Sequence, residues 1–166
     1  QVHGGMSFIE ETGAAQHYRD ARILPIYEGT NGIQALDLLG RKLLRDEGAA
    51  MTQLILELRA GLPEDESLRA PLAAAIAELD KATAWLLENG TKDIAQGAAG
   101  ATPYLNLCGT VIGAWLLARA TAAGDDGARR KTARFYAANL LGEAAGFAQA
   151  VIEGAGSTLA FDDDDF

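Results

Sequence analysis

The chain has 166 residues, 49% of them hydrophobic, which is enough for one domain with a buried core. Its net charge is −9 and its 14 basic residues are scattered, so we expect no nucleic-acid partner. No uninterrupted apolar stretch approaches the roughly eighteen residues of a membrane span, so none is predicted. The single cysteine, Cys108, excludes an internal disulfide and lies in an apolar run typical of a buried thiol. With no visible signal peptide, this composition predicts a cytoplasmic location.

The chain opens at Gln1, without an initiator methionine, inside the turn-like stretch QVHGG. We therefore expect it to be the C-terminal part of a longer protein.

Helical periodicity dominates the whole sequence, and signals for strands are nearly absent. A short helix is expected at about 10–21, and Pro25, Gly29 and Gly32 then interrupt the chain. Thr30 or Asn31 can cap the next helix. Further apolar stripes predict helices at about 33–44, 51–58, 68–87, 92–123 (broken or kinked at Pro103) and 128–151.

This pattern predicts an all-α fold, with an antiparallel bundle of four helices from about Gly48 onward. The last of them should turn Phe135, Leu140, Phe147 and Val151 inward. We divide the chain into residues 1–47, a bundle domain at 48–160 and an acidic tail at 161–166. The glycine turns of the first part look shaped around something absent from the chain.

The stretch ILPIYEGTNGIQ places one carboxylate, Glu28, in a glycine-flanked turn just ahead of a helix. Glycines allow close approach to a ligand, and a helix start offers N–H donors, so Glu28 could abstract a proton there. The plainer interpretation makes Glu28 and Thr30 ordinary turn and cap residues. His3 and His17 have no cluster of metal-ligating residues around them, which argues against a metal site.

Read as one string, QVHGGMSFIEETGAAQHYRDARILPIYEGTNGIQALDLLGRKLL resembles the last conserved block of the acyl-CoA dehydrogenases. The family pattern is Q-x-x-G-G-x-G-[YF], then E, R-D-A-[RK]-I, I-Y-E-G-T and a final I-Q. The match covers about residues 1–44. The remainder is similar, more loosely, to the extra helical C-terminal domain of a longer bacterial branch that includes 3-methylmercaptopropionyl-CoA dehydrogenases.

This resemblance implies that Glu28 is the base that removes the α-proton of an acyl-CoA thioester, and that its N–H binds the thioester oxygen. It implies that Gly29 lines the thioester and that Thr30, Asn31 and Gly32 contact FAD. It also implies that a neighbouring subunit's FAD is reached by Gln1, Val2, His3, Gly4 and Gly5. The assembly would then be a homodimer or homotetramer, and an electron-transfer flavoprotein would reoxidise the flavin.

The chain departs from the family in two respects. Ser7 stands where the pattern has glycine, and the upstream helical domain and β-domain that build most of the FAD site are not in this sequence. We therefore expect the 166 residues alone to be catalytically silent. The alternative function is a helical dimerisation or interaction module with no catalysis of its own.

Overall fold

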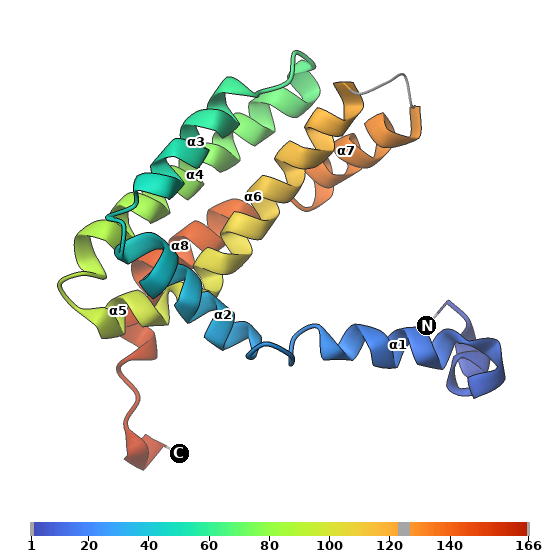
Figure 1. Cartoon of the computed structure of the whole chain (residues 1–166), viewed down its shortest axis with the longest axis horizontal. Coiled ribbons are helices and arrows are strands. Elements are labelled where there is room, and N and C mark those ends of the chain that lie inside the picture. Colours follow the sequence, from blue (N-terminus) through green and yellow to red (C-terminus); the bar gives the residue numbers. More distant parts are fainter. Residues whose placement is uncertain (1, 123–126, 166) are drawn as a thin grey trace. The chain divides into compact units, whose positions relative to one another are not determined.

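The computed structural model describes residues 2–122 and 127–165, so the Gln1 prediction lies outside the described part, as does the last residue of the tail (Figure 1). Throughout these two ranges the secondary structure is helical, with no strand, which confirms the all-α prediction. The chain divides into two compact units, Gln1–Gln34 and Ala35–Phe166, and the division falls inside helix α2 (Asn31–Asp37).

The first unit is a string of short helical elements: 3₁₀ turns at Gly4–Phe8 and Glu10–Thr12, then α1 (Ala14–Ile23). Both 3₁₀ turns pack on α1. Within residues 2–34 every described residue is exposed or only partly buried. This unit therefore has no hydrophobic core of its own.

The second unit is a helical bundle with a continuous core. It follows α2 with a π-helical segment at Leu38–Leu44, and then contains α3 (Ala49–Ala60), α4 (Glu66–Asn89), α5 (Ile94–Ala99), α6 (Ala101–Ala122), α7 (Gly127–Asn139), α8 (Glu143–Thr158) and a 3₁₀ turn at Asp163–Asp165. Helices α4, α6 and α8 pack on one another, α3 packs along α4, and α7 contacts α4 and α6 (Figure 1). The apolar stripes of these helices thus meet in one cluster.

Two helices of the bundle begin at aspartate caps. The Asp65 carboxylate accepts from Ser67 N at 3.1 Å at the start of α4, and Asp93 accepts from Ala95 N at 3.0 Å at the start of α5. Each bond satisfies an N–H that the first helical turn leaves open. Asp65 also bonds Arg134 of α7 at 2.8 Å, which ties the start of α4 to α7.

The bundle differs from the four-helix prediction in the number and ends of its helices. The stretch 92–123 breaks at Gly100, between α5 and α6, so Pro103 occupies the first turn of α6, where its missing N–H costs nothing. The final stretch is two helices, because Leu140 N and Leu141 N both bond Tyr136 O and end α7.

The prediction that Phe135 and Leu140 face inward, as Val151 does, is wrong. Val151 is fully buried, Phe147 is partly buried against the core, and Phe135 and Leu140 are exposed. Ala133 and Phe135 are two positions apart and therefore lie on different faces of α7, and the helix turns Ala133 to the core and leaves Phe135 outside. The predicted burial of Cys108 is confirmed.

Helix α6 is apolar enough to be considered as a membrane span. Its 22 residues and its mean hydropathy of 1.2 over an 18-residue window meet the criterion of length and composition. In this fold α6 packs against α4, α7 and α8, as the core helix of a bundle does.

Candidate functional site

Glu28 lies at the tip of the turn between α1 and α2 with a left-handed backbone. Its φ is +57°, and that of Gly29 is +93°. A left-handed residue other than glycine costs about 1–2 kcal/mol, so the turn holds Glu28 in a strained conformation. A Cβ on Gly29 would lie 2.9 Å from Ile33 Cγ2, so glycine is required here by its φ and by the closeness of α2.

The side chain of Gln34 spans this turn. Its Nε2 donates to the carbonyl oxygen of Glu28 at 2.5 Å, and its backbone N–H donates to Thr30 O at 3.0 Å. Gln34 is therefore fixed in the first turns of α2 while its amide holds the peptide between Glu28 and Gly29.

The turn leaves its own polar groups open. Among residues 2–122 and 127–165, no atom accepts a hydrogen bond from the N–H of Glu28 or Gly29, and none bonds the Glu28 carboxylate. The side chains of Thr30 and Asn31 are likewise without a hydrogen bond to these residues. A carboxylate beside free N–H donors can take a proton from a carbon acid whose oxygen those donors bind.

A second Glu-Gly turn, Glu47–Gly48, shows what an ordinary turn of this geometry looks like. Its φ angles, +56° and +78°, have the same sign. However, Glu47 N donates to Leu44 O at 3.3 Å, and Gly48 N lies 2.9 Å from Leu43 O and 3.0 Å from Asp46 Oδ1. The chain satisfies the N–H groups of this turn itself, whereas the described residues leave those of the Glu28 turn available.

The N-terminal stretch forms a separate 3₁₀ turn. Gly4 has a φ of +58°, and Ser7, which replaces the family's glycine, donates from Oγ to Gly4 O at 2.7 Å. The serine thus closes the turn rather than disrupting it. Val2, His3, Gly4 and Gly5 are all exposed.

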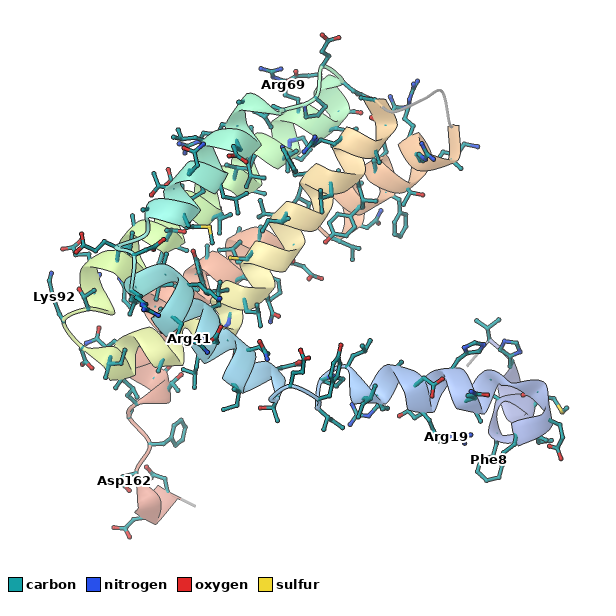
Figure 2. All side chains as sticks on the ribbon, in the orientation of Figure 1. Phe8, Arg19, Arg41, Arg69, Lys92 and Asp162 are labelled. Atoms are coloured by element: carbon teal, nitrogen blue, oxygen red, sulfur yellow. The ribbon has the colours of Figure 1, made fainter. Side chains whose placement is uncertain are left out.

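Beside this turn lies a cleft of about 640 Å³, lined in part by His3, Phe8, Tyr18 and Arg19. Arg19 also bonds Glu10 at 3.2 Å, and Figure 2 shows Phe8 and Arg19 at the same end of the unit. Aromatic faces and a guanidinium are suitable contacts for a flat heterocycle and a phosphate.

The structure does not bring the two predicted groups of site residues together within one chain. Val2–Gly5 lie at the start of α1, and Glu28–Gly32 follow its end. The ten residues of α1 span about 15 Å between them. Each group would therefore contact a different part of a ligand, or a different ligand.

The glycines provide a test of fit for FAD. A Cβ on Gly5 would meet no atom within 4 Å, and one on Gly32 would meet only Thr30 Oγ1 at 3.9 Å. Packing within this chain therefore does not require glycine at either position, whereas a bound group lying against the backbone would. The residues present leave room for a cofactor beside the backbone at either position.

Sequence reasoning gave Gln34 no role, although its signal was present as the final I-Q of the family pattern. Only the hydrogen bond to Glu28 identifies its place in the site. Across the described residues no cluster of three metal-ligating side chains occurs.

The bundle contains a buried polar pair, Thr83 and Tyr104, next to Cys108. Burial raises the pKa of the Tyr104 hydroxyl far above its usual value and raises the pKa of the Cys108 thiol to about 12. Both groups stay protonated at neutral pH, so Cys108 is not a reactive thiolate.

Two families match the sequence in successive segments. Residues 1–44 match the family described as "Acyl-CoA dehydrogenase, C-terminal domain", and residues 48–162 match "Acetyl-CoA dehydrogenase C-terminal like". The second match alone covers more than half of the chain.

Individual relatives agree with these matches. A 3-methylmercaptopropionyl-CoA dehydrogenase of Ruegeria pomeroyi is 46% identical over 124 residues, which are 70% of this chain and 21% of the relative. A broad-specificity linear acyl-CoA dehydrogenase of Mycobacterium tuberculosis, FadE5, is 32% identical over 152 residues, 82% of this chain and 25% of the relative. The human mitochondrial short-chain specific acyl-CoA dehydrogenase is 54% identical over 43 residues, 26% of this chain and 10% of the relative.

The chain thus spans about a fifth to a quarter of the length of the first two relatives. Its two matched segments and its helical fold agree with the C-terminal region of one family. The chain belongs to the acyl-CoA dehydrogenase family.

Proposed function

We propose that this chain supplies the catalytic base of an FAD-dependent acyl-CoA dehydrogenase, and that the base is Glu28. The observation that carries the proposal is the Glu28 turn, whose carboxylate and N–H groups are free of the described residues. The longer protein that would carry the chain is called the parent protein below.

In this reaction the Glu28 carboxylate takes the α-proton of the acyl-CoA thioester. Negative charge then develops on the thioester oxygen, and the free N–H of Glu28 donates to that oxygen, which stabilises the charge where it forms. Gly29 lies beside the thioester and keeps the turn close to α2, as its φ and its contact with Ile33 require. The bound FAD supplies the acceptor for the β-hydrogen, which leaves the substrate as hydride.

The cofactor would be held by both ends of the first unit. Thr30, Asn31 and Gly32 contact the FAD of the same active site, because they adjoin Glu28. Val2, His3, Gly4 and Gly5, together with Gln1, contact the FAD of a neighbouring subunit. The separation of the two groups by α1 supports this division. On this proposal the parent protein is a homodimer or homotetramer.

An electron-transfer flavoprotein would reoxidise the flavin, and the protein would work in the cytoplasm. The first statement rests on the family, and the second rests on a composition with one cysteine, Cys108. The relatives' names include both a thioether and linear acyl chains, so both classes of acyl-CoA are candidate substrates.

A second candidate is a helical interaction module without catalysis. It is favoured by the bundle, which has a complete core, while residues 2–34 have none. On either proposal the 166 residues alone are catalytically silent. Size-exclusion chromatography of this chain with and without FAD tests the module, which a colourless stable dimer supports. Near-stoichiometric bound flavin would instead contradict the expectation that the isolated chain is silent.

The decisive test is anaerobic bleaching of the flavin in the parent protein, titrated with short, medium, long and thioether acyl-CoAs. Glu28→Gln removes the basicity but keeps the shape, so flavin reduction should fall by several orders of magnitude while FAD stays bound. Glu47→Gln is the matched control, because Glu47 has the same backbone conformation in a turn that the chain satisfies itself. Unchanged reduction in Glu28→Gln would place the base elsewhere.

A further inference from the structure

The strained turn that carries Glu28 has few interactions to maintain it. The Glu47–Gly48 turn is held by backbone hydrogen bonds to Leu43 O and Leu44 O and by the carboxylate of Asp46. At the Glu28–Gly29 turn these bonds have no counterpart among the described residues. A polar side chain does bond this turn: Gln34 Nε2 donates a hydrogen bond to Glu28 O.

We infer that Gln34 is the positioning residue of the base: its side-chain amide fixes the peptide between Glu28 and Gly29 and so sets where the carboxylate and the N–H of Glu28 point. This inference rests on the proposed function. Gln34 itself does not reach the reacting atoms, and it acts through Glu28.

The geometry gives Gln34 two anchors. Its backbone N–H is bonded to Thr30 O within the start of α2, and its side chain returns to the carbonyl six residues earlier in the sequence. A Cβ on Gly29 would lie 3.7 Å from Nε2 and 2.9 Å from Ile33 Cγ2, so the turn lies directly against this face of α2. Holding the carbonyl prevents the peptide from rotating about its neighbouring bonds, and therefore restricts ψ of Glu28.

Gln34→Met keeps the length of the side chain and removes the donor. The turn can then leave the left-handed conformation, which relieves its strain and displaces the base. Because a displacement of about 1 Å costs on the order of 100-fold in rate, we expect a 10- to 100-fold lower limiting rate of flavin reduction. The acyl-CoA concentration for half-maximal bleaching should change by less than about threefold, because Gln34 makes no contact with the acyl group.

The experiment measures anaerobic flavin reduction in the parent protein with Gln34→Met, Gln34→Glu and the control Gln53→Met. Gln34→Glu is nearly isosteric, but its ionised carboxylate cannot donate, so it should act in the same direction. Gln53 also donates from Nε2, to Glu57 Oε1 at 3.1 Å on the exposed face of α3, and its loss should leave the rate unchanged. FAD content and melting temperature are recorded for each variant.

A second measurement needs no flavin. In the isotopically labelled 166-residue chain, the carbonyl ¹³C resonance of Glu28 should shift on Gln34→Met and not on Gln53→Met, since only the first removes its hydrogen bond. A shift together with the lower limiting rate supports the positioning role.

The outcomes separate the two proposals. If acyl-CoA bleaches the wild type and Gln34→Met equally fast, the positioning role is overturned and the proposed function stands. If Gln34→Met loses FAD or weakens substrate binding as much as it slows reduction, Gln34 is a general structural residue and the inference is again overturned. If no acyl-CoA bleaches the wild type, the proposed function fails and the inference falls with it.

Discussion

The hydroxyl groups of Thr83 and Tyr104 lie 2.8 Å apart in the middle of the bundle, on helices α4 and α6. Thr83 uses its only hydroxyl proton to donate to Leu79 O at 2.7 Å, so Tyr104 must be the donor between the two. Both residues are buried, and Tyr104 is fully enclosed. The pair therefore links two core helices through a hydrogen bond, and the hydroxyl protons of both residues are donated to an acceptor.

The two hydroxyls should differ in what their removal costs. Tyr104→Phe removes a donor and leaves the Thr83 bond to Leu79 in place, so the free energy of unfolding should fall by about 1 kcal/mol. Thr83→Val removes the oxygen that accepts from the buried Tyr104 hydroxyl, which should cost about 1–3 kcal/mol. Urea unfolding of both variants and of the double variant tests this. Equal losses, or strict additivity, would contradict the assigned direction of the bond.

Asp65 should make the stability of the bundle depend on pH. Its hydrogen bonds from Ser67 and then its pairing with Arg134 hold the pKa of this carboxyl below its usual value of 3.8. A lowered folded-state pKa gives stability that is present above the unfolded value and is lost as pH falls through the folded value.

Asp65→Asn keeps a cap but loses the pairing with Arg134, so its urea midpoint should lie below the wild type at pH 7. The two midpoints should converge as the pH is lowered below 3.8, the usual value of this carboxyl. Asp93→Asn is the control at pH 7, because Asp93 caps α5 without an arginine partner in the described chain. If the two urea midpoints still differed in acid, the lower stability of Asp65→Asn would have a cause other than the lost charge of Asp65.

Two glycine-to-alanine changes should have opposite signs. Gly48 has a φ of +78°, and a Cβ there would lie 2.5 Å from Leu87 Cδ1, so Gly48→Ala should destabilise the bundle by at least about 1–2 kcal/mol. Gly109 is exposed inside α6, and its Cβ would meet nothing within 4 Å. Gly109→Ala should therefore stabilise by about 0.5–1 kcal/mol through helix propensity. Thermal or urea unfolding measures both, and a neutral Gly48→Ala would show that the turn relaxes.

The first unit should exchange its amide hydrogens far faster than the bundle in the isolated chain. None of residues 2–34 is fully buried, and large apolar side chains stay exposed there, including Val2, Phe8, Tyr18 and Leu24. Opening α1 therefore exposes little new apolar surface, whereas opening α6 breaks the core.

Hydrogen exchange followed by mass spectrometry should show α1 exchanged within minutes while α4, α6 and α8 remain protected. In the parent protein α1 should gain protection, because its apolar side chains would be covered there. Protection of α1 equal to that of α6 in the isolated chain would contradict this.

The sequence predicts the helices of the bundle better than their ends or their faces. The stripe through Leu68, Leu72, Ile76 and Leu79 is buried as its spacing indicates. Phe135 has the same apolar character but is exposed, because α7 turns Ala133 to the core and a residue two positions away lies on another face of the helix. The break that separates α7 from α8, where Leu140 N and Leu141 N bond Tyr136 O, is likewise not encoded in the spacing.

The same limit applies to the site. Glu28–Gly29 and Glu47–Gly48 share residue types and φ signs, so sequence and backbone conformation alone do not distinguish them. They differ in which atoms accept from their N–H groups, and only coordinates show that. The family pattern singles out Glu28, while the hydrogen bond from Gln34 explains how its turn is held.

The bundle core includes residues that precede it in the family matches. Ala35, Leu39 and Leu43 are 1% exposed and belong to the core cluster, although the match to the bundle family begins at residue 48 and the preceding match ends at 44. The segment assigned to one module thus completes the interior of the other. If the chain were cut between the two matched segments, in evolution or in protein engineering, the bundle would lose three of its core side chains. The extra bundle can be transplanted intact only together with the helix that follows Gln34.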